Sequence, residues 1–241
     1  MQLNYKIVVT GGSGRFGSIL QKKYKSNKLL YPNKKQLNIL STKSVEKYLK
    51  KTNPKILIHL AGLSRPMRVH DVNISKSIDL NIIGTANIVK VCSKLRIKLI
   101  YFSTNYVYEG KKGNYKETDP ILPINNYAWS KLGGESSVQM YKNSLILRVC
   151  MTEEPFIHKK AFSNVKTNFI FHKEVANILF KVLKLKGIIN IGGKIQSPFN
   201  FGKKYNKNLR KILAKKNFPR SEEHTSELQS LAYLVCRLLL E

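Results

Sequence analysis

Cysteine and tryptophan are scarce in this chain of 241 residues, and the shortage of cysteine limits its chemistry. Cys92, Cys150 and Cys236 form no CxxC pair and lack the spacing with histidine that metal sites require. Three thiols are also too few for a disulfide framework. We therefore expect isolated reduced thiols and no metal site.

Long apolar runs are missing as well. The first residues, MQLNYKIVVT, enter a short β-type run without the apolar region of a secretion signal, and no segment is long enough to span a bilayer. These features predict a cytoplasmic protein without membrane association. A hydrophobic content of 42% is sufficient for the core of one large or two small α/β domains.

Acidic residues are few, 14 against 43 lysines and arginines, which gives a formal net charge of +29. Clustered basic residues bind nucleic acids by releasing counterions. Here the lysines are spread along the whole chain among many Asn and Ile residues, and no nucleic-acid-binding motif is present. We expect a basic surface that attracts anionic ligands, and no nucleic-acid partner.

The last 22 residues, 220–241, differ in composition from the rest of the chain. Their sequence, RSEEHTSELQSLAYLVCRLLLE, is reproduced in two segments by in-frame translation of a common sequencing-library adapter. A genuine amphipathic helix is the alternative interpretation. We exclude 220–241 from functional reasoning and expect that the natural C-terminus is missing.

Apolar periodicity predicts that strands and helices alternate along the chain. Strands are expected at 6–10, 28–31, 36–39, 55–62, 98–104, 144–149 and 187–193, and helices at 16–24, 41–51, 75–95, from about 127, and at 172–184. Alternating buried strands and helices are typical of a parallel sheet that is covered on both faces. The predicted fold class is therefore α/β.

A glycine cluster follows the first predicted strand. TGGSGRFG, residues 10–17, fits the pattern TGxxGxxG with Gly11, Gly14 and Gly17. Glycine lets the backbone turn sharply and approach a pyrophosphate, which then lies at the N-terminus of the following helix. In this strand–turn–helix context the motif predicts dinucleotide binding.

The end of the second predicted strand lacks the acidic residue that commonly holds the adenosine ribose. It reads LLYPNKK, so that Asn33, Lys34 and Lys35, together with Arg15 of the glycine turn, are candidates to bind a 2′-phosphate. This composition favours NADPH, and NADH is the alternative. In so basic a chain these lysines can equally be ordinary solvated side chains.

Tyr127 and Lys131, in the stretch NNYAWSKLGGE, lie four residues apart on a predicted helix and therefore share one face. A nearby ammonium is expected to lower the pKa of the phenol. Such a pair can transfer a proton at a carbonyl oxygen during hydride transfer, and the lysine can also hold the nicotinamide ribose. Thr104, at the end of the preceding strand, is expected to hydrogen-bond the same oxygen.

Six motifs then follow one another in a familiar order: TGGSGRFG, HLAGLS, DLNIIGTANIV, STNYVYEG, GNYKETDPILPINNYAWSKLGGE and LILRV. In this the chain resembles the extended short-chain dehydrogenases/reductases, and most closely the dTDP-4-dehydrorhamnose reductase or sugar-nucleotide-binding family. The resemblance is strong over about 4–150 and weaker over 170–205. It implies a Rossmann-type doubly wound sheet in 1–150, followed by a small, truncated substrate-binding region in 151–219.

The resemblance also implies a role for individual residues. Those implied to hold the cofactor phosphates are Gly11, Gly14, Arg15, Phe16 and Gly17. Those implied to flank the adenine or line the dinucleotide path are Asn38, Ile39, Ala61, Gly62 and Ser64. Thr104, Tyr127 and Lys131 correspond to a catalytic triad supported by Asn81, and Tyr106 to a contact with the sugar.

Several positions depart from the family pattern. Asn105 replaces an Asp and Met151 replaces a Trp, while the segment between Arg148 and the helix at 172–184 is short for a substrate lid. Arg65 and Arg68 are also atypical. They are either a bidentate grip on a substrate diphosphate or solvated surface residues.

The implied activity is the NADPH-dependent reduction of a nucleotide-linked 4-keto sugar. An epimerase on the same fold and a non-catalytic NADP-binding regulatory subunit are the alternatives. A dehydratase is disfavoured because those relatives carry an acidic pair after the threonine, where this chain has Asn105 and Tyr106. The implied partner is a nucleotide sugar, and the resemblance is compatible with a homodimer.

Overall fold

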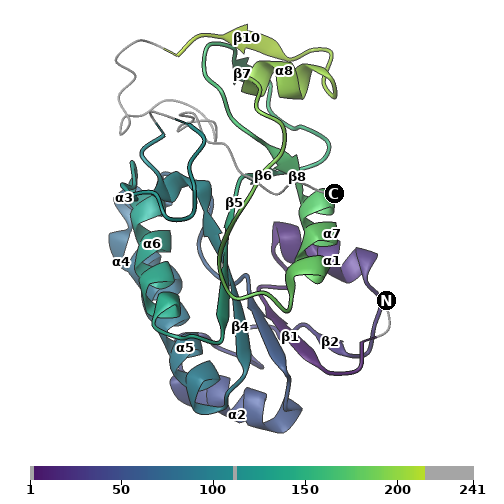
Figure 1. Cartoon of the computed structure of the whole chain (residues 1–241), viewed down its shortest axis with the longest axis vertical. Coiled ribbons are helices and arrows are strands. Elements are labelled where there is room, and N and C mark those ends of the chain that lie inside the picture. The colour runs from purple at the N-terminus through teal and green to yellow at the C-terminus, as the bar shows by residue number, and fades with distance from the viewer. Residues whose placement is uncertain (1–2, 111–112, 215–241) are drawn as a thin grey trace.

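The structure is a computed structural model that describes residues 3–110 and 113–214. Its centre is a six-stranded sheet in the order β2-β1-β3-β4-β5-β9, in which every neighbouring pair is parallel (Figure 1). The strands are β1 (Ile7–Thr10), β2 (Leu29–Leu30), β3 (Ile56–His59), β4 (Lys98–Thr104), β5 (Ser144–Val149) and β9 (Gly187–Ile191). The predicted α/β fold is confirmed.

Helices cover both faces of this sheet (Figure 1). On one face α1 (Arg15–Lys23) lies beside α7 (His172–Val182), and Leu20, Val175 and Leu179 join the strands in a fully buried apolar cluster. The opposite face carries α2 (Thr42–Thr52), α5 (Gly84–Lys94) and α6 (Asn126–Gln139) over a second cluster. The sheet is therefore doubly wound, as the sequence predicts.

The helix predicted at 75–95 is continuous but not uniform. Two short helices, α3 (Val69–Val72) and α4 (Ile74–Ser77), precede a π-helical segment, η1 (Ile78–Ile83), which runs directly into α5. Within this transition the Thr85 hydroxyl donates to the Asn81 carbonyl oxygen at 2.8 Å. Single π turns within α-helices often occur at functional sites, and this one presents Asn81 toward α6.

The prediction of a strand at 36–39 is wrong, because the structure has no strand there. Asn33 and Gln36 exchange side-chain-to-backbone hydrogen bonds of 2.9 and 3.0 Å, which close a turn in place of an extended segment. Leu37 and Ile39 are still buried, but in the core beneath α2 and α5 rather than in the sheet. An apolar alternation can mark burial without marking a strand.

The segment after β5 contributes both to the main sheet and to a small region beyond the sheet. α7 and β9 return to the main sheet, whereas two small parallel pairs, β6 (Met151–Thr152) with β8 (Ile170–Phe171) and β7 (Lys160–Phe162) with β10 (Arg210–Ile212), lie beyond its carboxyl edge (Figure 1). With α8 (Pro198–Lys203) they enclose an aromatic cluster of Phe156, Phe169, Phe171 and Phe201.

Two predictions fall partly or wholly outside the described residues. The proposed adapter-derived tail, 220–241, lies outside them, as does Cys236. Cys92 and Cys150 are free and buried. Within the described residues no helix is long and apolar enough to cross a membrane, and no three metal-ligating side chains are grouped to hold an ion.

Candidate active site

A cavity of about 230 Å³ opens at the carboxyl edge of the sheet. It lies where the strand order reverses, between β1, which is followed by β2 on one side, and β3, which is followed by β4 on the other. Its walls are the glycine turn, the loop after β3, the end of β4, the start of α6, and the segments after β5 and before α7. Ligands of open α/β sheets bind at this type of topological switch point.

Two glycines of the glycine turn are packed too closely for a larger residue. Gly11 has a φ of +71°, and a Cβ added to it would lie 2.6 Å from the backbone nitrogen of Ala61. A Cβ on Gly17 would collide with the backbone of Gly11 and Gly12. These close approaches place the N-terminus of α1, with its free N–H groups, against the cavity.

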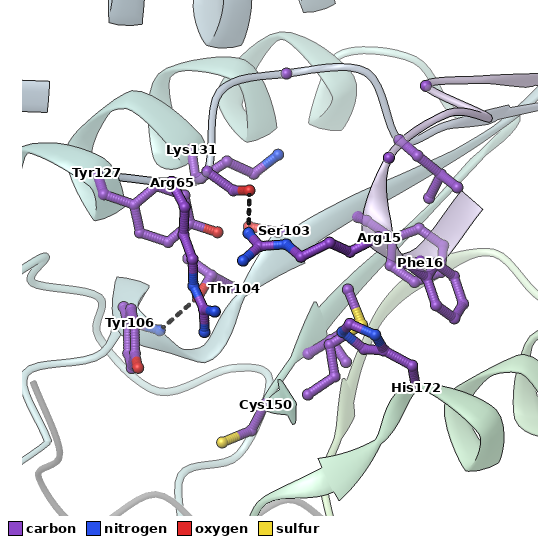
Figure 2. A pocket seen from close by; sticks show the side chains of 18 of the residues that line it. Arg15, Phe16, Arg65, Ser103, Thr104, Tyr106, Tyr127, Lys131, Cys150 and His172 are labelled. Carbon is purple, nitrogen blue, oxygen red and sulfur yellow. Dashed lines mark hydrogen bonds between the residues drawn. The ribbon is translucent and has the colours of Figure 1, made fainter. Parts of the chain in front are cut away.

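Helix α6 brings two of the predicted catalytic side chains to the same cavity. Asn125 caps the helix, its side-chain oxygen accepting from the N–H of Ala128 at 2.8 Å. The Tyr101 hydroxyl of β4 donates to the carbonyl oxygen of Lys131 at 3.0 Å. Tyr127 and Lys131 line the same cavity as Thr104, the last residue of β4 (Figure 2).

Asn81 lies behind the cavity wall rather than in it. Its side chain is buried, accepts from the N–H of Leu63 at 2.7 Å and donates to the Leu63 carbonyl at 2.8 Å. It also donates to the Ser130 hydroxyl at 2.8 Å. Asn81 therefore ties the loop after β3 to α6, which is a supporting position for the residues that line the cavity.

The expected lowering of the Tyr127 pKa by Lys131 is wrong. Burial raises the pKa of Tyr127, and the groups that oppose this are a hydrogen bond with Thr104 and the charges of Arg15 and Arg65. Lys131 Nζ instead lies 4.2 Å from the centroid of the Tyr101 ring. Burial lowers the pKa of Lys131 to about 7, against the opposing charge of Glu135.

A charged cluster that the sequence did not predict crosses the mouth of the cavity. Arg15 Nη1 and Arg65 Nη1 both donate to Glu153 Oε1 at 3.0 Å, and Arg15 Nη2 donates to the Ser64 hydroxyl at 2.9 Å. Figure 2 shows Arg15 and Arg65 reaching in from different sides. Burial raises the pKa of Glu153, but the two arginines outweigh it and hold that pKa below its usual value.

Glu153 and His172 are therefore cavity residues missed at the sequence level. Two adjacent acids, Glu153 and Glu154, soon after the LILRV strand of so basic a chain were the available signal for Glu153. His172 begins α7 and packs against Phe16 of the glycine turn, with ring centroids 5.8 Å apart. Burial lowers the pKa of His172 to about 4.

The other predicted residues divide into two groups. Those that line the cavity are Gly11, Gly14, Arg15, Phe16, Gly17, Gly62, Ser64, Thr104, Tyr106, Tyr127 and Lys131. Those that do not are Asn33, Lys34, Asn38, Ile39, Ala61 and Asn81. Asn33 and Lys34 are exposed just after β2, near the glycine turn, since a Cβ on Gly12 would lie 2.9 Å from the Tyr31 ring.

Two buried histidines with strongly lowered pKa values predict a loss of stability in acid. The ring of His59 is bracketed by Thr10 at 2.8 Å and Thr85 at 3.2 Å, and burial lowers its pKa to about 3, compared with about 4 for His172. Unfolding restores a pKa near 6.5, so the unfolded chain binds more protons as the pH falls from about 6.5 toward these values. We expect the free energy of unfolding to fall by about 3 to 4 kcal/mol between pH 7 and pH 5.

Urea denaturation at pH 7, 6 and 5 measures this change. His172→Gln is the matched control, because it removes one of the two groups and should reduce the loss by about half. A free energy of unfolding that stays constant over this range would contradict the assignment of both histidines as neutral in the folded protein.

Comparisons with known proteins show which sequences and folds the chain resembles. Methionine adenosyltransferase 2 subunit beta of Pongo abelii is 29% identical over 144 residues, which cover 56% of this chain and 43% of that protein. dTDP-4-dehydrorhamnose reductase of Aggregatibacter actinomycetemcomitans is 27% identical over 152 residues, covering 61% and 51%. The chain spans less than half the length of the first of these relatives.

Among solved structures, dTDP-4-dehydrorhamnose reductase from Bacillus anthracis in complex with NADP superposes with a TM-score of 0.79. It is 21% identical, and the match covers 88% of this chain and 86% of that one, which shows a shared fold. The family profile described as RmlD substrate binding domain matches residues 5–170, more than half of the sequence. The chain therefore belongs to the RmlD substrate binding domain family.

Proposed function

We propose that this protein is a nicotinamide-dependent reductase of a nucleotide-linked 4-keto sugar, with NADPH as the preferred cofactor. The observation that carries the proposal is that Thr104, Tyr127 and Lys131, from β4 and α6, meet in one cavity beside the glycine turn. Membership of a family that includes dTDP-4-dehydrorhamnose reductases supports this assignment.

The residues present fit a dinucleotide. Gly11 and Gly17 leave a cradle that a Cβ would fill, the N–H groups of α1 face it, and the Arg15 guanidinium adds a positive charge. These residues would hold the pyrophosphate, and Lys131 would hold the nicotinamide ribose. When bound, the cofactor supplies the hydride.

The cavity residues would transfer one proton to the substrate. Because burial raises its pKa, Tyr127 keeps its proton at neutral pH and can donate it to the keto oxygen as negative charge develops there. Thr104, hydrogen-bonded with Tyr127, would hold the same oxygen. The positive charges of Arg15 and Arg65 stabilise the phenolate that remains, until a proton from solvent restores the phenol.

The direct test is NADPH oxidation by the full chain with a panel of dTDP-, UDP- and GDP-linked 4-keto sugars. Turnover of one member at a rate that depends on Tyr127 supports the proposal. A protein that does not bind NADPH would contradict it, and binding without turnover would favour the second candidate below.

A non-catalytic cofactor-binding subunit is the second candidate. It is favoured by the match to a protein named as the beta subunit of methionine adenosyltransferase 2 and by the small region beyond the sheet edge. Co-elution with a catalytic chain of methionine adenosyltransferase in size-exclusion chromatography, in the presence of NADPH, tests this alternative.

Cofactor preference gives a separate prediction. We expect Lys34→Ala combined with Lys35→Ala to reduce the NADPH over NADH preference about tenfold, since charge-assisted contacts to a phosphate contribute about 1.5 to 3 kcal/mol. Lys22→Ala with Lys23→Ala, two exposed lysines at the far end of α1, is the matched control and should leave the ratio unchanged. If both double variants show the same NADPH over NADH preference, the 2′-phosphate is bound by other residues.

A further inference from the structure

We propose that Glu135, with Arg148 as its counter-ion, is a positioning residue that fixes α6 against the end of β4 and supplies the negative charge facing Lys131. This proposal rests on the proposed function, because Lys131 has a catalytic role only in that function. Its test reads the protonation of Lys131 directly, so it does not require turnover.

Glu135 and Arg148 form an ion pair that is almost completely removed from solvent, with exposed side-chain fractions of 0% and 2%. Glu135 Oε1 accepts from Arg148 Nη2 at 2.6 Å and from Nε at 3.1 Å. Its other oxygen, Oε2, accepts from the Ser103 hydroxyl at 2.5 Å. One carboxylate therefore joins α6, β5 and β4 at the residue immediately before Thr104.

Arg148 also forms hydrogen bonds with groups other than Glu135. Its Nη1 donates to the Tyr108 hydroxyl at 2.6 Å and to the carbonyl oxygen of Glu117 at 3.2 Å. The Tyr108 hydroxyl donates to Asn190 Oδ1 of β9 at 2.9 Å. The carboxylate of Glu135 is thus anchored to three strands of the main sheet and cannot move toward Lys131 or away from it without breaking this network.

Lys131 lies one helical turn before Glu135, on the same face of α6. The other groups packed near it are uncharged: the Tyr101 ring of β4, and His59 of β3 and His70 of α3, whose pKa values burial lowers. Tyr127, in the preceding turn of α6, keeps its proton. Within the described part of the chain, Glu135 is the negative group that acts on Lys131.

This arrangement matters because Lys131 titrates near neutrality. Burial brings its pKa down to about 7, and the charge of Glu135 opposes that fall. A buried ion pair contributes little net stability compared with apolar side chains of similar size. Its place between the helix that carries Lys131 and the strand end that carries Thr104 gives it a second role, which is to increase the fraction of Lys131 that stays charged near pH 7.

Two substitutions separate this role from a purely structural one. Glu135→Gln and Arg148→Gln break the same ion pair, so both should reduce the midpoint of urea denaturation. We expect the pKa of Lys131 to move in opposite directions: down by about one unit in Glu135→Gln, and up in Arg148→Gln, where the carboxylate faces the ammonium alone. A loss of packing alone would not produce opposite signs.

The measurement is an NMR titration of ¹³Cε-labelled lysine, with the Lys131 signal assigned by its loss in Lys131→Met. Ser103→Ala is the control, because it removes a hydrogen bond without removing charge and should leave this pKa within about 0.3 unit. In Glu135→Gln the alkaline limb of the pH–kcat profile should move to lower pH by the same amount as the Lys131 pKa.

A Lys131 pKa that is unchanged in Glu135→Gln, or shifts the same way in both Gln variants, would overturn the proposal. If Glu135→Gln does not fold, the double variant Glu135→Gln with Arg148→Met leaves no unpaired buried charge and should also show a lowered Lys131 pKa. Opposite shifts without turnover of any keto sugar would support the positioning role and contradict the reductase assignment.

Discussion

Tyr127→Phe is expected to reduce the kcat of keto-sugar reduction by about 10²- to 10⁴-fold, the usual contribution of a general acid. The substitution removes the hydroxyl that forms a hydrogen bond with Thr104 in the cavity and keeps its proton at neutral pH. The affinity for NADPH should stay within about threefold, because the glycine turn and Arg15 are untouched. Single-turnover NADPH oxidation, with cofactor binding measured by fluorescence, separates the two quantities.

Tyr106→Phe is the matched control for this experiment. Its ring lies in the same cavity, with its centroid 6.2 Å from that of Tyr127, and the substitution also removes a phenolic hydroxyl. If Tyr106 contacts the sugar, the KM should rise by up to about tenfold while kcat changes little. Near-normal turnover in Tyr127→Phe, or equal losses of kcat in both variants, would mean that the proton comes from another group.

The parts of this site that the sequence predicts are those encoded by short local patterns. Gly11, Gly14 and Gly17 occur within one turn, and Tyr127 and Lys131 within one turn of a helix, so local backbone geometry nearly determines where they point. Thr104 ends a buried strand, and the ends of parallel strands share one edge of the sheet. Their convergence therefore follows from the fold class alone.

The parts that sequence reasoning misses depend on contacts between distant segments. Glu153 lies 88 residues from Arg65 and 138 from Arg15 along the chain, and no local pattern links them. The direction of the Tyr127 pKa is also a tertiary property, because it depends on how much protein surrounds the ring. A nearby lysine in the sequence predicts the opposite sign from the one that burial produces.

Glycine positions on α6 illustrate the same limit and give the second large prediction. A Cβ on Gly134 would lie 2.7 Å from the Tyr101 hydroxyl and 3.1 Å from Thr85 Oγ1, and still closer to the Asn81 carbonyl oxygen of η1. Tyr101 and Thr85 are almost fully buried, so neither side chain can move aside. Helix α6 itself must shift, and overpacking of this kind costs about 1 to 3 kcal/mol.

We therefore expect Gly134→Ala to lower the free energy of unfolding by about 1 to 3 kcal/mol in urea denaturation. It should also reduce kcat at least about tenfold, because the shifted helix carries Tyr127 and Lys131 away from Thr104. The hydrogen bond from Tyr101 to the Lys131 carbonyl lies at the point of collision and should weaken with it. Saturating concentrations of NADPH should not restore the lost rate, since the misplaced groups belong to the protein.

Gly133→Ala, one residue earlier, is the matched control. Its added Cβ would meet Cδ1 and Cγ1 of Ile82 at 2.7 and 2.9 Å, and this half-buried side chain can turn aside where backbone and buried hydroxyl groups cannot. Alanine also has a higher helix propensity than glycine by about 1 kcal/mol, so this variant should be neutral to slightly stabilised. Equal losses of stability in both variants would show that α6 tolerates no larger residue against η1, and that the buried backbone and hydroxyl groups facing Gly134 are no more restrictive than the Ile82 side chain.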